Sequence, residues 1–157
     1  QQRHTDNMKK VLFIAILVLA GSAVRAQVNP INWEFTAKKT AEKTYEVHMK
    51  ATIPAGWHLF SQVQPDDAVA LPTKITINPN PLLSTEGAIT EKGKMEKFHD
   101  AKLDISAHQF SGSVDFVQVV KLKANAKTSV TGTVLFQTCN DQKCLPAKTI
   151  PFTVAIK

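Results

Sequence analysis

Tyr45-Glu46-Val47-His48-Met49-Lys50-Ala51-Thr52-Ile53 is the stretch that decides the fold. Apolar side chains occupy every second position of it, and polar or charged residues fill the positions between them. Because successive side chains of a β-strand point to opposite faces, this period of two predicts a strand with one buried face and one solvent-facing face. Pro54-Ala55-Gly56 then ends the alternation with turn-forming residues.

The same period recurs along the chain, and turn residues separate the repeats at short intervals. No segment shows the spacing of an amphipathic helix. The pattern predicts about eight strands, and hence an all-β, immunoglobulin-like antiparallel β-sandwich. The extended segments are expected at residues 33–38, 45–53, 57–60, 72–77, 103–110, 114–122, 129–138 and 149–156.

The segment from Pro79 to Phe98 is weakly patterned. It contains Gly87, Gly93 and many charged residues. Since a structureless stretch of this length in a compact domain is usually functional or disordered, we expect a long loop here.

The first 26 residues have the features of upstream sequence followed by a secretory signal peptide. Met8-Lys9-Lys10 is a short basic region, Val11–Ala20 is apolar, and Val24-Arg25-Ala26 provides small residues for cleavage after Ala26. The apolar run is too short to span a bilayer comfortably, so no stable membrane insertion is expected after cleavage. We therefore expect one exported, periplasmic domain over residues 27–157.

The charge of the chain gives little support to nucleic-acid binding. The chain has 19 basic and 13 acidic residues, but four of the basic and one of the acidic residues fall in the predicted leader. The remaining 15 basic and 12 acidic residues give a net charge of only +3. Because the lysines scatter among strands and turns, a nucleic-acid partner is not expected.

The only two cysteines lie in Phe136-Gln137-Thr138-Cys139-Asn140-Asp141-Gln142-Lys143-Cys144-Leu145-Pro146. Expected strands flank this stretch, so the two cysteines face each other across a turn formed by Asn140 to Lys143. Facing residues of an antiparallel pair have Cα atoms roughly 4.5–5.5 Å apart, within the span of a disulfide. An exported chain with two cysteines meets oxidants, so the sulfurs should be able to pair.

Such a bond would be a weak staple for the fold. Closing a loop of about six residues contributes roughly 2 kcal/mol, against about 4–5 kcal/mol for a loop of a hundred residues. This contrast favours a redox-active pair, while an inert disulfide in a binding or structural domain remains the alternative.

Other chemistry has weaker support. The Cys-x4-Cys spacing differs from the Cys-x-x-Cys of thioredoxin-like enzymes. The histidines occur singly without ligand spacing, so neither a metal nor a cofactor is expected, and a periplasmic copper or zinc site is the less favoured alternative. The four histidines within residues 27–157 are His48, His58, His99 and His108. Lys143 would stabilise a neighbouring thiolate and Asp141 would oppose it, so both are candidate thiol-tuning residues.

Four segments, in order, resemble a known family. They are Ile31-Asn32-Trp33, Gly56-Trp57-His58-Leu59-Phe60-Ser61, Pro72-Thr73 and Gln137-Thr138-Cys139 with Cys144-Leu145-Pro146. Together they resemble the N-terminal periplasmic domain of the transmembrane thiol–disulfide interchange protein DsbD, over nearly all of residues 27–157. The resemblance implies an immunoglobulin-like fold.

The resemblance also implies protein-disulfide reductase-type chemistry without a separate cofactor. A thioredoxin-like domain or a membrane thiol reductant would supply electrons, and oxidised periplasmic proteins would receive them. Cys144 matches the cysteine that forms the mixed disulfide, and Cys139 matches the one that resolves it. Phe98, in Glu96-Lys97-Phe98-His99, matches an aromatic cap over the sulfurs; its other interpretation is an ordinary core aromatic.

The sequence departs from the family pattern at several positions. The spacing between the cysteines is shorter, Ala147 replaces a common proline, and Phe60 and Phe136 replace common tyrosines. Residues 27–157 contain no transmembrane segment and no Cys-x-x-Cys motif. If the chain is complete, we expect a free-standing module that meets its reductant by diffusion.

Overall fold

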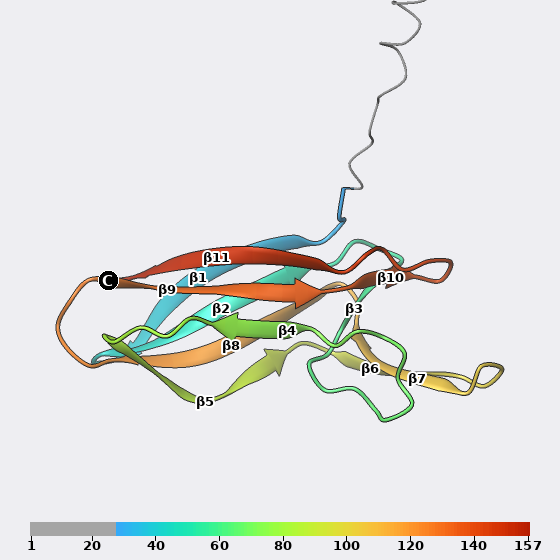
Figure 1. Ribbon diagram of the computed structural model, residues 1–157, viewed down its shortest axis with the longest axis horizontal. Coiled ribbons are helices and arrows are strands. Elements are labelled where there is room, and N and C mark those ends of the chain that lie inside the picture. Colours follow the sequence, from blue (N-terminus) through green and yellow to red (C-terminus); the bar gives the residue numbers. More distant parts are fainter. Residues whose placement is uncertain (1–27) are drawn as a thin grey trace, which may run out of the picture.

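The computed structural model describes residues 28–157, and the expected leader with its cleavage site after Ala26 lies outside the described residues. This described part contains eleven strands and no helix. The strands form three sheets in which every pairing is antiparallel (Figure 1). The predicted all-β class is confirmed.

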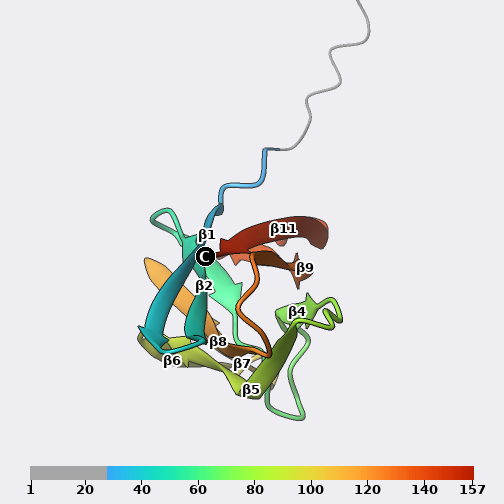
Figure 2. The same ribbon diagram turned by 90° about the vertical axis from the view of Figure 1, so that its left-hand side faces the viewer.

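Two of the sheets form the sandwich seen end-on in Figure 2. One has the order β1-β2-β8-β5 and the other has the order β11-β9-β4. The third sheet, of order β10-β3-β7-β6, extends one end of the molecule (Figure 1). The bounds are β1 (Asn32–Ala41), β2 (Thr44–Thr52), β3 (Trp57–Phe60), β4 (Lys74–Ile77), β5 (Leu83–Lys92), β6 (Met95–Asp100), β7 (Ile105–Phe110), β8 (Ser113–Leu122), β9 (Thr128–Phe136), β10 (Thr138–Asn140) and β11 (Lys148–Ile156).

The core lies between the facing sheets, as the alternating stretch predicts. The apolar residues from Tyr45 to Ile53 are all buried, with exposed fractions of 5% or less. An aromatic cluster then joins the two layers. Trp33 on β1 has its ring centroid 5.9 Å from that of Phe116 on β8 and 5.3 Å from that of Phe136 on β9. Burial of these large rings is the main stabilising contribution to such a core.

The prediction of a long loop over Pro79–Phe98 is wrong. Most of this segment forms β5 and the first part of β6. The register between β5 and β8 shifts between Glu86 and Thr90, and Gly87 takes a positive φ of 70° there. A bulge of this kind interrupts the period of two. In addition, β5 and β6 are edge strands, so many of their residues stay exposed and leave no apolar alternation.

The expected strand over 129–138 is divided in two. Strand β9 ends at Phe136 and stays paired with β11, whereas β10 begins at Thr138 and pairs with β3. The chain therefore changes sheets at Gln137. Strands β5, β6 and β10 account for the difference between the eight strands expected and the eleven observed.

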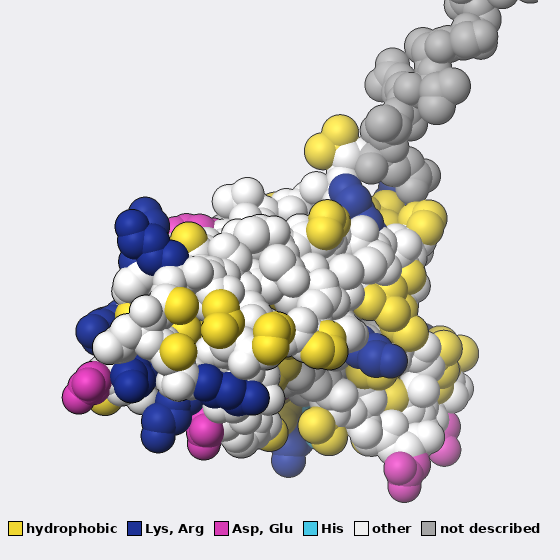
Figure 3. All heavy atoms as spheres, turned by 60° about the vertical axis from the view of Figure 1, so that its left-hand side comes forward, with side chains coloured by type: hydrophobic (Ala, Val, Ile, Leu, Met, Phe, Trp, Pro, Cys, Tyr) yellow, Lys and Arg dark blue, Asp and Glu magenta, His cyan; other side chains and the backbone are white. Residues whose placement is uncertain are grey.

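Figure 3 shows the side of the molecule away from the cysteine loop. Basic side chains gather toward the left of this view with a few acidic ones, and apolar side chains form a broken row beside them. Among the described residues, no helix is long and apolar enough to cross a bilayer.

Gly132 provides a test of the close approach between β9 and its neighbours. A Cβ added there would overlap the carbonyl oxygen of Thr76 and lie 2.8 Å from Cζ of Phe152. We expect Gly132→Ala to lower the free energy of unfolding by about 2–3 kcal/mol, because overpacking forces strand β9 away from its partners. Thr133→Ala, on the adjacent residue, should cost less than about 1 kcal/mol. Urea unfolding of both variants measures the difference, and equal losses would contradict this account.

Candidate functional site

The two cysteines form a disulfide at a tight turn. Cys139 lies in β10 and faces Cys144 through an isolated antiparallel bridge, with their Cα atoms 4.0 Å apart. The backbone N–H of Asn140 donates to the carbonyl of Lys143, and the N–H of Leu145 donates to the carbonyl of Thr138. These bonds bracket the cysteine pair, which therefore occupies a non-hydrogen-bonded position of the ladder, where side chains approach most closely.

The Asn140 side chain shapes this turn. Its Oδ1 accepts hydrogen bonds from the backbone N–H groups of Gln142, at 2.9 Å, and Lys143, at 2.8 Å. Asparagine favours turns through such local bonds to the following backbone. The predicted turn over Asn140 to Lys143 is thus confirmed, and the Asn140 side chain stabilises it.

The two sulfur-bearing residues differ in exposure. Cys144 is exposed, whereas Cys139 is only 7% exposed and belongs to a small buried cluster with Phe60 and Ala107. A protein partner approaching from solvent therefore meets Cys144 first. Cys139 faces the groove, where little of its surface is accessible.

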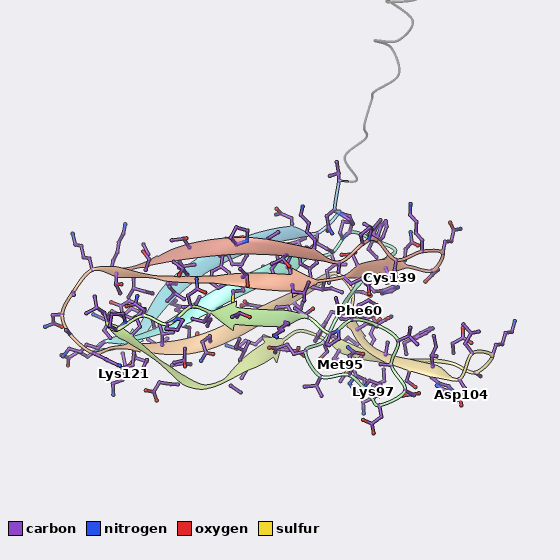
Figure 4. The ribbon with its side chains drawn as sticks, viewed as in Figure 1. Phe60, Met95, Lys97, Asp104, Lys121 and Cys139 are labelled. Carbon is purple, nitrogen blue, oxygen red and sulfur yellow. A yellow bond between two sulfur atoms is a disulfide. The ribbon has the colours of Figure 1, made fainter. Side chains whose placement is uncertain are left out.

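The β10-β3-β7-β6 sheet places further residues beside Cys139. In its register Cys139 opposes His58, Phe60 opposes Gln109, and Ala107 opposes Phe98. Because side chains alternate along each strand, one face of this sheet holds Cys139, His58, Phe60, Ala107, Gln109 and Phe98. The other face holds Thr138, Leu59 and Phe110, which are buried toward the sandwich. Figure 4 shows Cys139 and Phe60 at this end and Lys121 at the other.

The first of these faces forms the floor of a groove with a volume of about 840 Å³. Val69 and Ala70, from the loop between β3 and β4, line the groove together with the six residues of that face. Gln137, Cys144 and Asp141 line it from the cysteine segment. The disulfide is therefore part of the wall of a mostly apolar groove.

Hydrogen bonds fix the loop that forms the side of the groove. Ser61 Oγ donates to Glu91 Oε2 at 2.7 Å, and Gln64 Nε2 donates to the carbonyl of His108 at 2.7 Å. Gln137 connects this loop to the cysteine turn, because its Oε1 accepts from the N–H of Leu71 and its Nε2 donates to the carbonyl of Leu145, both at 3.4 Å. The groove is thus built on strands and an anchored loop.

His58 has polar contacts on both ring nitrogens. Nδ1 lies 3.0 Å from Ser111 Oγ and 3.3 Å from Gln109 Nε2. Nε2 lies 3.7 Å from Asp141 Oδ1. The Ser111 hydroxyl in turn donates to Glu96 Oε2 at 3.3 Å. A chain of polar groups therefore runs from the cysteine turn through His58 to strand β6.

The structure brings some of the predicted site residues together and not others. Asp141 lines the groove beside the cysteines, with a side chain that is 94% exposed. Lys143 is exposed, and within residues 28–157 its ammonium forms no ion pair with a carboxylate. Phe98 is 46% exposed and lies on the edge strand opposite β10, while Phe60 is packed with Cys139. The roles predicted for Asp141, Lys143 and Phe98 stay predictions.

Sequence reasoning included His58 in a segment that resembles the family and among the scattered histidines, but it did not place His58 beside Cys139. The period of two in Trp57–Phe60 places His58 and Phe60 on one face of a short strand. That pattern was a usable signal, but the register against β10 is set by contacts between residues about eighty positions apart.

The histidines do not gather around the sulfurs as metal ligands. His48 Nδ1 lies 2.7 Å from Asp115 Oδ2 on the sandwich, and His99 Nδ1 lies 3.0 Å from Ser106 Oγ. In the described part of the chain, no three histidine, cysteine or acidic side chains are grouped closely enough to hold a metal ion.

Asn140→Ala tests the turn. Losing two hydrogen bonds that hold the cysteines face to face should cost about 1 kcal/mol, so the equilibrium constant for reduction by dithiothreitol should rise roughly fivefold. Gln142→Ala is the matched control, because the Gln142 side chain makes no hydrogen bond within the described residues. Thiol quantification across a dithiothreitol series measures both variants. An unchanged constant in Asn140→Ala would contradict this role.

Comparisons with known proteins are informative at the level of structure. No protein-family model matches the sequence, and no curated protein matches it. Among solved structures, the N-terminal periplasmic domain of ScsB from Proteus mirabilis is similar with a TM-score of 0.56 at 13% identity, covering 87% of this chain. The match covers 49% of the length of that ScsB chain, so this chain spans about half of it.

The DsbD N-terminal domain of Neisseria meningitidis, solved in its reduced form, is also similar. Its TM-score is 0.52 at 13% identity, with 85% of this chain and 94% of that chain covered. The fold that the sequence resemblance implies is therefore confirmed: residues 28–157 have the immunoglobulin-like fold of the DsbD and ScsB N-terminal domains.

Proposed function

We propose that this protein is an exported thiol–disulfide exchange module that passes electrons between proteins through Cys139 and Cys144. The observation that carries the proposal is the asymmetry of the disulfide: Cys144 is exposed, and Cys139 is 7% exposed in the groove. A structural disulfide needs no such difference, whereas an exchange reaction needs one sulfur for the partner and one for the return step.

The reaction uses ordinary exchange chemistry. In the reduced protein, the Cys144 thiolate attacks one sulfur of a client disulfide, and a mixed disulfide forms as the other client sulfur leaves as a thiolate. Cys139 then attacks the Cys144 sulfur, and the bond between Cys144 and the client breaks. Two electrons move to the client, which becomes a dithiol, and the Cys139–Cys144 disulfide forms again. Reduction by a thioredoxin-fold donor or membrane thiol reductant is the reverse sequence.

The surface around the groove suits a protein partner. Five of the six large apolar side chains that are exposed in the described residues belong to the β3–β4 loop or the β6–β7 hairpin. These are Val63, Val69, Met95, Phe98 and Leu103. Both segments lie at the cysteine end of the molecule (Figure 1). A gathering of exposed apolar side chains is typical of a binding surface.

A trapping experiment tests which cysteine attacks the partner and which one resolves the mixed disulfide. With Cys139→Ala, the reduced protein should accumulate a mixed disulfide through Cys144 when mixed with an oxidised thioredoxin-fold domain, because no second thiol releases the partner. With Cys144→Ala, the buried Cys139 should trap far less. Non-reducing gels and mass spectrometry measure the adducts. Equal trapping by both variants would contradict the assignment.

The reduction potential separates this proposal from an inert disulfide. We expect a value well above the roughly −300 mV below which structural disulfides lie. Equilibration in glutathione and dithiothreitol redox buffers provides the measurement. A potential below that limit, together with no trapped complex, would favour a binding or structural domain instead.

We further propose that Phe98 shields the reduced thiols from small oxidants, by closing across the groove that it shares with Cys144. Phe98→Ala should raise the rate of Cys144 alkylation by iodoacetamide in the reduced protein severalfold, because access to a sulfur limits its reactions. Leu103→Ala is the matched control, since Leu103 is 68% exposed on the neighbouring turn and does not line the groove. Comparable rates in the wild type and Phe98→Ala would remove the capping role.

A further inference from the structure

We propose that His58 is the general base that removes the proton from Cys139 when the mixed disulfide is resolved. The inference rests on the proposed exchange function and names a further catalytic residue for it. The need for a base follows from burial. Cys139 is packed with Phe60 and Ala107, and apolar surroundings disfavour the charged thiolate that must attack.

Position supports this assignment. His58 opposes Cys139 directly in the β3–β10 register, and both residues line the groove. Directly opposed residues of an antiparallel pair have Cβ atoms roughly 4.5–5.5 Å apart, so the ring and the thiol are neighbours. Imidazole is the side chain that most often takes a proton near neutral pH.

The contacts of the ring leave the correct nitrogen available. Two neighbours of His58 Nδ1 ask for opposite roles: Ser111 Oγ, which donates its only proton to Glu96 Oε2, can accept from Nδ1 at 3.0 Å, whereas Gln109 Nε2 at 3.3 Å can only donate to it. The tautomer that satisfies the shorter of these contacts carries the hydrogen on Nδ1. The Nε2 lone pair is then free on the side of the cysteine turn. After Nε2 takes the proton, Asp141 Oδ1 at 3.7 Å stabilises the imidazolium. Asp141 and Glu96 are the charged groups that face this assembly from the elements packed around it.

The step balances. The Cys139 Sγ–H bond breaks as His58 Nε2 takes the proton, and Cys139 Sγ forms its bond to Cys144 Sγ while the bond between Cys144 and the client breaks. The client sulfur leaves with the electron pair and takes a proton from the imidazolium or from water. In the reverse direction, the protonated ring returns the proton to Cys139 as it leaves.

A disulfide reagent that releases a coloured thiolate allows the two steps to be measured separately. Excess dithiobis(nitrobenzoate) reacts with reduced protein and releases one thiolate as Cys144 is attached and a second as Cys139 resolves the adduct. In His58→Gln, the first release should keep its wild-type rate, and the second should slow about 10–100-fold, because hydroxide replaces the lost base only partly. The second release should also become proportional to hydroxide between pH 6 and 8, whereas the wild type should be less steep.

Two comparisons distinguish a base from a structural residue. His48→Gln removes a histidine of the sandwich that contacts Asp115 and does not line the groove, so both releases should keep wild-type rates. In His58→Ala, added imidazole should restore the second release in proportion to its concentration. Equal second-release rates in the wild type and His58→Gln, or no rescue by imidazole, would overturn the role of His58. Absence of any second release in the wild type would instead overturn the proposed function.

Discussion

The pairing of β10 with β3 is the constraint on which the site depends. Only three residue pairs form it, from Thr138 opposite Leu59 to Asn140 opposite Trp57. Because side chains alternate across a strand, this register sends Thr138 toward the core and Cys139 into the groove. A slip of one residue would send Cys139 into the core and Thr138 into the groove. The placement of the cysteine pair thus follows from backbone hydrogen bonds.

The main hydrophobic core and the cysteine groove lie in different parts of the molecule along its long axis. The sandwich between the two larger sheets contains the aromatic cluster around Trp33, which holds the fold together. The end sheet contributes one face to that core and keeps the other for the groove. A disulfide that closes only a short loop contributes little to global stability, so we expect its opening to leave this core intact. Such an arrangement suits a site that must be oxidised and reduced repeatedly.

Much of the fold was predictable because period-two alternation records burial directly. Residues 45–53 were assigned from this pattern and residues 114–122 from a more continuous apolar run, and both form central strands of the first sheet. The pattern fails at β5 and β6, which lie at sheet edges and carry a bulge at Gly87, so few of their side chains are buried. The split at Gln137 was also hidden, because β9 and β10 continue the same alternation although they belong to different sheets.

The sequence by itself determined the strand-rich class, the cysteine turn and the ability of Cys139 and Cys144 to meet, because each depends on local spacing. Only the tertiary structure decided that Cys139 is buried while Cys144 is exposed, and that His58, Phe60 and Phe98 share their groove. These relations join strands that are distant in the chain. They are set by sheet register and by the packing of the core, and no local pattern records either of them.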